Sequence, residues 1–334
     1  MIKKQILSYT VFLVSLCLAG CFYRPNAQRS SLVTPTESNL IVVGYAQVGA
    51  ESDWRVANTQ SFKSTFTEEN GFELIFIDAQ QKPENQIKAL RNFIQQEVDY
   101  IVLAPIVESG WDSVLKEVKE AGIPLILSDR MVNVEDDSLY VSWVGGNFVK
   151  EGEDSVEWLH NYLKEIGRDK EIINIVEMQG TLGSTAEIGR TEGIEKKIAE
   201  YPNFRLLEKQ TGDFVQSMGQ EVMEGFLKKY DDIDVLIAQN DNMAFGAIDA
   251  IEAAGLVPGK DIIIISIDAV KAALEEIVAG RINASIECNP LHGPRVAEII
   301  RKLEAGEPVE KKIYVNEEIF DIKNAAERLP TREY

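Results

Sequence analysis

The chain has 334 residues and is 45% hydrophobic and 26% charged, which is typical of a globular protein and too apolar for a disordered one. Its length predicts about two domains. The formal net charge of −20 argues against nucleic acid as a partner, because phosphate contacts require a basic face. The excess of Asp and Glu is typical of a well-solvated surface.

Motifs for metals, cofactors and catalysis are missing. His160 and His292 are the two histidines, and no Cys-x-x-Cys spacing occurs, so the sequence predicts no zinc site. The phosphate-binding pattern Gly-x-x-x-x-Gly-Lys-Ser/Thr and the nucleophile pattern Gly-x-Ser-x-Gly are also absent. We therefore expect no metal and no cofactor, and these motifs give no indication of an enzyme.

Residues 1–20 are predicted to be a lipoprotein signal peptide. Lys3 and Lys4 precede an apolar run over 6–18, which is short for a transmembrane helix. The run ends in Leu-Ala-Gly-Cys, which resembles a bacterial lipobox, with Cys21 as the lipidated residue. An uncleaved anchor or an incidental cysteine is the alternative. Residues 21–39 are rich in Ser, Thr, Pro, Asn and Gln and are predicted to be a flexible, lipid-anchored tether. The predicted location is therefore extracytoplasmic and membrane-anchored.

From residue 40 onward, short apolar runs alternate with amphipathic segments. Such an alternation predicts βαβ units, in which a parallel sheet carries helices on both faces. The first series comprises predicted strands at 40–46, 74–77, 100–104 and 124–127 and predicted helices at 53–69, 83–97 and 111–121.

The pattern restarts near Gly145 and Gly146. The second series comprises predicted helices at 147–166, 186–200, 216–229 and 243–254 and predicted strands at 172–176, 206–209, 235–238 and 262–267. A last strand–helix pair, at 284–286 and 290–303, comes late enough to return to the first half. The expected fold class is α/β, with two doubly wound parallel-sheet lobes.

Polar side chains follow the predicted strands, where parallel sheets bind ligands. Carboxylates, guanidinium groups and amides beside a tryptophan suit a polyhydroxyl ligand, because they form charge-assisted hydrogen bonds while the aromatic ring covers a sugar's C–H face. Each residue also has a structural alternative. Asp53, Asp241 and Asp268 suit helix N-caps, Asp129–Arg130 a local ion pair, Trp54 the core and Arg190 a solvated helix face.

Several of these segments together resemble the bacterial galactofuranose-binding proteins, within the ribose/galactose-type periplasmic sugar-binding family. The resemblance covers nearly all of 40–334. It is carried by VGYAQVGAESDWR (43–55), DAQQKPENQIK (78–88), APIV (104–107), LSDR (127–130), EMQGTLGS (177–184), TGDF (211–214), QNDNM (239–243), PGKDI (258–262) and SID (266–268).

The resemblance implies a periplasmic binding protein type I fold, whose two lobes are joined by three hinge crossovers around a sugar-binding cleft. The implied lobes are 40–145 plus 289–317 and 146–288 plus 318–334. Two positions depart from the family pattern: Cys288, where some relatives carry Gln, and Gly146, where relatives often carry Asp. The implied sugar contacts are Glu51, Trp54, Arg55, Asp129, Arg130, Arg190, Phe214, Asn240, Asp268 and Asn289.

Three functions follow as hypotheses. The first is a monomeric, lipid-anchored protein that captures a monosaccharide and delivers it to the transmembrane subunits of an ABC importer. The second is a sensor that presents the sugar to a membrane histidine kinase or chemoreceptor. The third is a glycosidase that pairs Asp129 with Asp268 or Glu51, which we disfavour because no nucleophile–base constellation stands out. A sugar-responsive repressor is rejected because the N-terminus carries a signal and tether in place of a DNA-binding headpiece.

Overall fold

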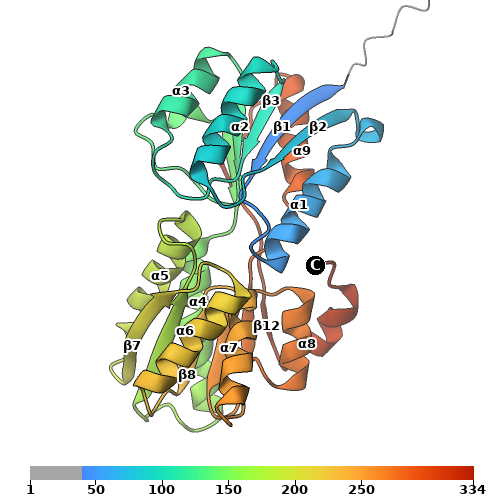
Figure 1. Ribbon diagram of the computed structural model, residues 1–334. Helices are drawn as coiled ribbons and strands as arrows, with labels where there is room; N and C mark the ends of the chain where they lie inside the picture. The colour runs from blue at the N-terminus through green and yellow to red at the C-terminus, as the bar shows by residue number, and fades with distance from the viewer. Residues whose placement is uncertain (1–39) are drawn as a thin grey trace, which may run out of the picture. The chain divides into compact units, whose positions relative to one another are not determined.

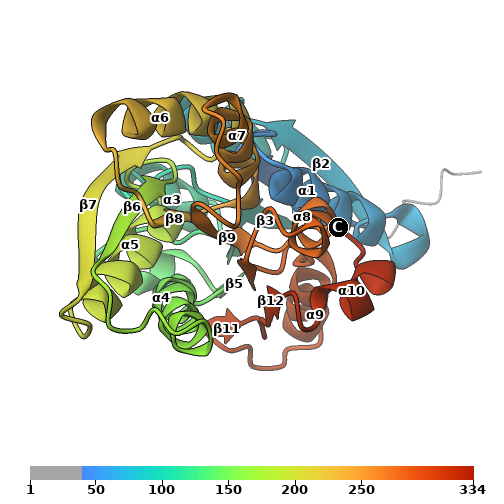
Figure 2. The ribbon, with the colours of Figure 1, turned by 90° about the horizontal axis from the view of Figure 1, so that it is seen from below.

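The computed structural model describes residues 40–334, which belong to one compact unit. They contain two six-stranded sheets, one in each lobe, in the strand orders β11-β5-β4-β3-β1-β2 and β12-β10-β9-β8-β6-β7. Figures 1 and 2 show the two lobes with their helices. The predicted signal peptide (1–20), the lipidation at Cys21 and the tether (21–39) lie outside the described residues.

The first lobe has a wholly parallel sheet with helices on both faces. Alternate residues of a strand point to opposite faces. Tyr100 and Val102 accordingly pack with α1 and α9, whereas Ile101 and Leu103 pack with α2 and α3. The elements are β1 (Ile41–Gln47), α1 (Asp53–Thr65), β2 (Phe72–Asp78), α2 (Pro83–Gln95), β3 (Tyr100–Leu103), α3 (Asp112–Glu120), β4 (Leu125–Ser128), β5 (Ser142–Gly145), α9 (Gly293–Glu304) and β11 (Lys312–Tyr314).

The second lobe repeats this plan, except that its edge strand β12 runs antiparallel to β10. Val235 and Ile237 pack with α4 and α5, while Leu236 and Ala238 face the core formed with α6, α7 and α8. Figure 2 shows these two helix layers on either side of the sheet. The elements are α4 (Phe148–Glu165), β6 (Ile173–Gln179), α5 (Thr185–Ile198), β7 (Phe204–Thr211), α6 (Gln216–Lys229), β8 (Val235–Ala238), α7 (Asp241–Ala253), β9 (Ile263–Asp268), α8 (Lys271–Ala279), β10 (Ala284–Glu287), β12 (Ile319–Asp321) and α10 (Ala325–Arg328).

The chain passes between the sheets three times, namely between β5 and α4, between β10 and α9, and between β11 and β12. The predicted fold class, two doubly wound lobes joined by three crossovers, is therefore confirmed. The late strand–helix pair divides between the lobes: β10 pairs with β9 in the second sheet, and α9 packs with α1 in the first lobe. The exact lobe boundaries given above remain predictions.

Several elements have other bounds than the sequence pattern predicts. The helix expected over 53–69 ends at Thr65, and a short 3-10 turn follows at Glu68–Asn70. The expected strands 172–176 and 206–209 are longer, as β6 and β7. The sequence reading did not predict β5, α8, β11, β12 and α10.

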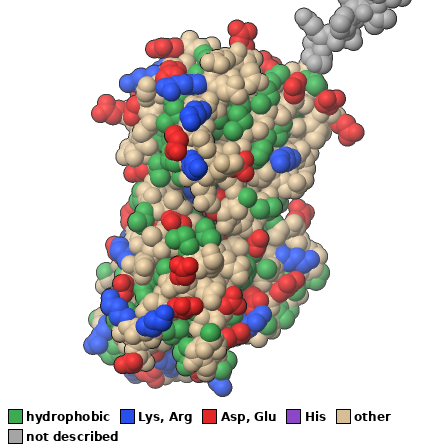
Figure 3. Space-filling view, in the orientation of Figure 1, with side chains coloured by type: hydrophobic (Ala, Val, Ile, Leu, Met, Phe, Trp, Pro, Cys, Tyr) green, Lys and Arg blue, Asp and Glu red, His purple; other side chains and the backbone are tan. Residues whose placement is uncertain are grey.

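The surface carries the charge of the protein. Acidic and basic side chains are interspersed over the face of both lobes in Figure 3, as expected for a solvated surface. Within residues 40–334, the structure contains no helix that has both the length and the apolar content required to cross a membrane.

Candidate functional site

A pocket lies between the lobes, where the carboxyl ends of both parallel sheets face each other. It encloses about 270 Å³ of empty space, counted together with its opening to solvent. The pocket is lined by Glu51, Ser52, Trp54, Arg55, Asp129, Arg130, Ala186, Arg190, Phe214, Asn240, Asp268 and Cys288.

In the first lobe, Arg55 organises the polar wall. It lies in the first turn of α1, whose N-cap Ser52 accepts a hydrogen bond from the Arg55 backbone. Its guanidinium donates to Glu51 Oε1 at 2.9 Å and to Asp129 Oδ2 at 2.6 Å. Burial favours a raised pKa for Asp129, but the nearby Arg55 and Arg130 outweigh this effect and hold the pKa below its usual value. Asp129 is therefore an ionised acceptor at neutral pH.

In the second lobe, Arg190 on α5 has the corresponding position. It is 3% exposed, and its guanidinium donates to Glu151 Oε2 at 2.7 Å and to the backbone oxygen of Gln239 at 2.6 Å. Asp268 Oδ1 lies 3.7 Å from the same guanidinium. Burial raises the pKa of Asp268 well above its usual value, and Arg190 opposes this shift. The solvated-helix alternative for Arg190 is therefore wrong.

Two aromatic rings complete the walls. The Trp54 Nε1–H donates to the backbone oxygen of Cys288 at 2.6 Å, which joins α1 to the second crossover. The Phe214 ring lies 5.2 Å from the Arg130 guanidinium and 5.7 Å from that of Arg190, so cations from both lobes hold it. A Cβ atom on Gly180 would lie 1.9 Å from the Phe214 ring. Glycine at 180 is therefore required for this wall.

Two polar atoms of the pocket have no hydrogen-bond partner among the described residues, Arg130 Nε and Glu51 Oε2. Both side chains are buried, and a buried polar atom without a partner costs about 1–3 kcal/mol. Burial lowers the pKa of Arg130 to about 10, so its guanidinium remains charged at neutral pH. A donor and an acceptor of this kind match a hydroxyl group, which accepts from one and donates to the other.

The charges of the pocket balance. Three guanidinium groups face three carboxyl groups, so basic and acidic groups are equal in number. A neutral ligand rich in hydroxyl groups fits such a lining better than a phosphate or a polycarboxylate does. The groups are Arg55, Arg130, Arg190, Glu51, Asp129 and Asp268.

Backbone strain is concentrated at the same strand ends. Asp129, Phe214 and Asp268 have positive φ angles of 66°, 64° and 113°. Side chains other than glycine rarely adopt this region, and such residues cluster at ligand sites where the surrounding structure imposes the conformation. The strain turns these three side chains toward the pocket.

The helix-cap alternative is wrong for the three aspartates to which it was assigned. The N-cap residues of α1, α7 and α8 are Ser52, Asn240 and Val270. Asp241 instead accepts hydrogen bonds from Ser266, Ser285 and the Val270 backbone. Asn240 both caps α7 and lines the pocket.

The structure brings nine of the ten predicted contacts together around the pocket. Trp54 belongs to a hydrophobic core cluster as well. The Asp129–Arg130 ion pair is loose, at 3.8 Å, because Arg55 is the closer partner of Asp129. The nine are Glu51, Trp54, Arg55, Asp129, Arg130, Arg190, Phe214, Asn240 and Asp268.

Asn289 is the tenth predicted contact, and the structure does not place it in the pocket. Its Oδ1 accepts from the Leu291 backbone at 3.0 Å, and its Nδ2 lies 3.3 Å from Glu287 Oε1. The preceding residue, Cys288, lines the pocket instead. Sequence reasoning also missed Ser52 and Ala186, which are small residues with no distinctive chemical signal.

Contacts between the lobes flank the pocket. The Asp53 backbone donates to Asn242 Oδ1 at 3.0 Å, and Asn242 Nδ2 donates to Asp53 Oδ2 at 3.2 Å. On the other side, the Met131 backbone donates to Thr185 Oγ1 at 2.9 Å. These hydrogen bonds hold the two half-sites against each other.

Comparison with known proteins gives consistent results. A family model described as "Periplasmic binding protein domain" matches residues 43–297. The galactofuranose-binding protein YtfQ of Escherichia coli is 41% identical over 293 residues, which cover 86% of this chain and 90% of that protein.

Two solved structures are also similar. One, from Mycobacterium smegmatis in complex with β-D-fucofuranose, is 44% identical with a TM-score of 0.85 and covers 88% of this chain and 95% of its own. The other is the binding component of the arabinose ABC transporter of Shewanella sp. ANA-3, bound to α- and β-L-arabinofuranose. It is 41% identical with a TM-score of 0.82 and covers 87% of this chain and 95% of its own.

Proposed function

Because the chain belongs to the family of periplasmic binding protein domains, we propose that it is an extracytoplasmic protein that captures a monosaccharide, galactofuranose or a similar furanose, between its two lobes. The observation that carries this proposal is the composition of the pocket. Paired guanidinium and carboxylate groups lie beside two aromatic rings in a space of about 270 Å³.

Similar proteins support the same ligand class. Those compared above are named for galactofuranose or contain fucofuranose or arabinofuranose. They are binding proteins, which confirms the prediction that this chain is not an enzyme. The carboxylates of the pocket then act as hydrogen-bond acceptors for sugar hydroxyl groups, and no glycosidase role is assigned to them.

Binding is coupled to closure of the lobes. Glu51 and Arg130 belong to the first lobe, whereas Arg190 and Asp268 belong to the second. A sugar that contacts both sets binds the closed arrangement more tightly than the open one, and this difference in affinity is what shifts the equilibrium. Each hydrogen bond to a charged group contributes roughly 1.5–3 kcal/mol. A few of them support micromolar binding, about −8 kcal/mol.

The proposal includes anchoring and delivery. Cys21 carries the lipid, residues 21–39 act as the tether, and the closed monomer docks on the transmembrane subunits of an ABC importer. The lipobox-like sequence at residues 18–21 supports the anchor. The similarity to the binding component of the Shewanella arabinose ABC transporter supports the importer. The sensor hypothesis shares the pocket and differs in the docking partner.

Calorimetric titration with ring-locked analogues tests the ligand. 1,4-Anhydro-D-galactitol has a fixed five-membered ring, and 1,5-anhydro-D-galactitol is its six-membered counterpart. We expect the former to bind more tightly, together with measurable binding of L-arabinose, D-fucose or D-galactose, which include furanose forms in solution. Equal or reversed preference would refute the furanose assignment. Absence of binding by all five would refute sugar capture.

Cell fractionation and sugar uptake test the anchor and the partner. In the native host, Cys21→Ala should move the protein from the membrane fraction to the soluble extracytoplasmic fraction. Deletion of the gene should abolish uptake of the sugar that binds in vitro. Normal uptake together with loss of sugar-induced gene expression would instead identify the protein as a sensor.

A further inference from the structure

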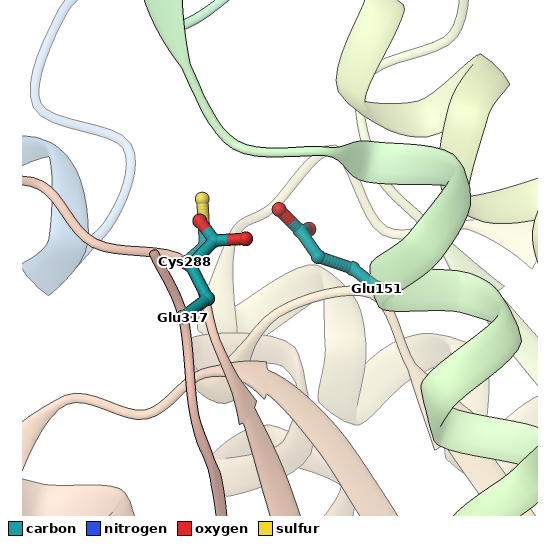
Figure 4. Close-up of side chains that lie close together, drawn as sticks. All are labelled: Glu151, Cys288 and Glu317. Carbon is teal, nitrogen blue, oxygen red and sulfur yellow. The ribbon is translucent and has the colours of Figure 1, made fainter. Parts of the chain in front are cut away.

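A second cluster of reactive side chains lies beside the sugar pocket, where the three crossovers converge. Glu151 is in the first turn of α4, just after the first crossover. Cys288 follows β10 in the second crossover, and Glu317 lies between β11 and β12 in the third. One ligand atom from each residue lies within 4.8 Å of the other two. Figure 4 shows the three side chains directed toward one another.

The Glu151 carboxylate points into this cluster with one unsatisfied oxygen. Glu151 is 2% exposed, and its Oε2 accepts from Arg190. Its Oε1 has no hydrogen-bond partner among the described residues, and Figure 4 shows the carboxylate turned toward Cys288 and Glu317. A buried charged oxygen without a partner is costly. A cation bound between the three side chains would satisfy this second oxygen.

Acidic groups outnumber cations at this point. Arg190 is the cation that contacts Glu151, and it is shared with Asp268. Glu317 is half-buried and accepts from the Asn289 backbone at 3.3 Å. Burial, followed by the negative charge of Glu151, raises the pKa of Glu317 to about 9. Glu317 therefore holds a proton at neutral pH, which a bound cation would have to displace.

Gly146 makes the approach of the two carboxylates possible. A Cβ atom on Gly146 would lie 2.4 Å from Glu151 Oε1 and 2.6 Å from Glu317 Oε1. Any larger side chain would occupy the space into which both oxygens project. The two positions that depart from the family pattern, Gly146 and Cys288, thus lie at this one cluster.

We propose that Glu151, Cys288 and Glu317 bind a divalent transition-metal ion of zinc-like character. Two carboxylate oxygens and one cysteine sulfur are ligands of Zn²⁺, at about 2.0–2.3 Å from the metal, with a fourth position left for water. The thiolate favours such an ion over Ca²⁺ or Mg²⁺, which prefer oxygen ligands. Binding converts the Cys288 thiol into a thiolate and Glu317 into a carboxylate, and it releases both protons to solvent.

The site would connect the segments that bend when the lobes move. Its three ligands come from, or immediately follow, the three crossovers, so a bound ion would cross-link them near the pocket. The sequence spacing gave no sign of it, because the ligands are far apart in the chain and include no histidine. This proposal does not depend on which sugar binds.

Metal titration of the purified protein tests the proposal. The chain from residue 21 with Cys21→Ser has Cys288 as its one remaining thiol. After treatment with a chelator, it is titrated with ZnCl₂ by calorimetry and with CoCl₂ by absorbance. We expect one equivalent of each metal to bind, a thiolate-to-cobalt charge-transfer band to appear, and the melting temperature to rise with metal concentration.

Three variants decide the assignment. Cys288→Ser should remove the charge-transfer band, and Glu317→Gln should weaken Zn²⁺ binding by at least about 100-fold, because even the loss of an outer-shell partner costs 10–100-fold. Glu153→Gln, on the same helix α4, is the matched control and should bind as the parent does. Thermal unfolding without metal checks that each variant is folded.

Two outcomes would overturn the metal site. One is no Zn²⁺ binding at about 1 mM by the folded parent protein. The other is binding that persists unchanged in both Cys288→Ser and Glu317→Gln. In either case Glu151 and Glu317 would instead share a proton. The sugar titration is a separate measurement, so failure of one proposal leaves the other standing.

Discussion

Replacement of Arg130 by Gln tests whether the unsatisfied atoms of the pocket are the ones that bind the sugar. Arg130 Nη1 donates to the Ile106 backbone at 3.2 Å, and Nη2 lies 3.5 Å from Glu51 Oε1. Nε lies 3.8 Å from Asp129 Oδ2 and has no hydrogen-bond partner among the described residues. The substitution removes the charge and the Nε–H donor while keeping a polar side chain. Arg55 still pairs with Glu51 in the variant, so the carboxylate is not left without a cation.

The expected loss follows from one charge-assisted hydrogen bond. Such a bond contributes roughly 1.5–3 kcal/mol, so Arg130→Gln should weaken sugar binding by about 10- to 150-fold. Calorimetric titration of the sugar measures this directly. Arg91→Gln is the matched control. Arg91 lies on α2, where it is exposed and pairs with Glu117, so this substitution should leave the sugar affinity within about twofold of the parent value.

A double-mutant cycle sharpens the result. If one hydroxyl of the sugar accepts from Arg130 Nε and donates to Glu51 Oε2, the effects of Arg130→Gln and Glu51→Gln will not add, and the coupling energy will be about 0.5–3 kcal/mol. Additive effects would mean separate hydroxyl groups. A loss of less than threefold in folded Arg130→Gln would refute the assignment of Arg130 as a sugar contact.

Three further substitutions test other parts of the structure. Burial raises the pKa of Glu177 from 4.5 to about 7, so the folded state retains a proton that the unfolded chain releases. The free energy of unfolding should therefore fall by roughly 3 kcal/mol as pH rises from about 4.5 to 7. Urea unfolding at pH 5 and 7.5 should show a smaller fall for Glu177→Gln. The same fall in the variant as in the parent would refute the raised pKa of Glu177. Gly180→Ala should displace Phe214 and lower the unfolding free energy by about 1–3 kcal/mol. Calorimetry should also show weaker sugar binding. Wild-type stability and affinity would contradict the close packing of Phe214 on Gly180. Asn242→Ala removes the hydrogen bonds to Asp53 and should weaken sugar binding by about fivefold, or about 1 kcal/mol. The free energy of unfolding in urea should stay near the wild-type value. Unchanged sugar affinity would mean that this contact between the lobes does not favour their closure.

Sequence patterns sufficed for the central strands of both lobes because those strands are buried on both faces. β3 and β8 consist of four buried residues each, and such apolar runs between amphipathic helices allow one main interpretation. The short strands β11 and β12 lack this signal. They contain three residues each and include exposed or partly exposed positions, so their pairing depends on the tertiary structure.

Most of the pocket was predictable for a related reason. Residues directly after parallel strands converge at one edge of a sheet, and Asp129, Phe214 and Asp268 accordingly line one pocket. The register of a crossover has no comparable rule. Cys288 lines the pocket and Asn289 does not, because the Asn289 side chain accepts from the Leu291 backbone and closes a local turn.

The crossover cluster was not predictable from spacing, because its burial results from three distant segments. Glu151 by itself is an acidic residue in the first turn of a helix, a position that the helix dipole favours. Only the folded chain shows that Arg190 pairs with one of its oxygens and that the other is buried without a hydrogen-bond partner within residues 40–334. Burial without compensation is therefore the property that distinguishes this glutamate from the many solvated ones.

The pocket and the crossover cluster are linked through Arg190. Its guanidinium contacts Glu151 in the cluster and lies near Asp268 in the pocket, so any ion that neutralises Glu151 changes the electrostatic environment of a carboxyl group that lines the pocket. The Trp54 indole, which lines the pocket, also donates to the Cys288 backbone. A metal held by Cys288 and a sugar held beneath Trp54 would each stabilise the same arrangement of the second crossover. Their binding should therefore be positively coupled, and the coupling must be reciprocal.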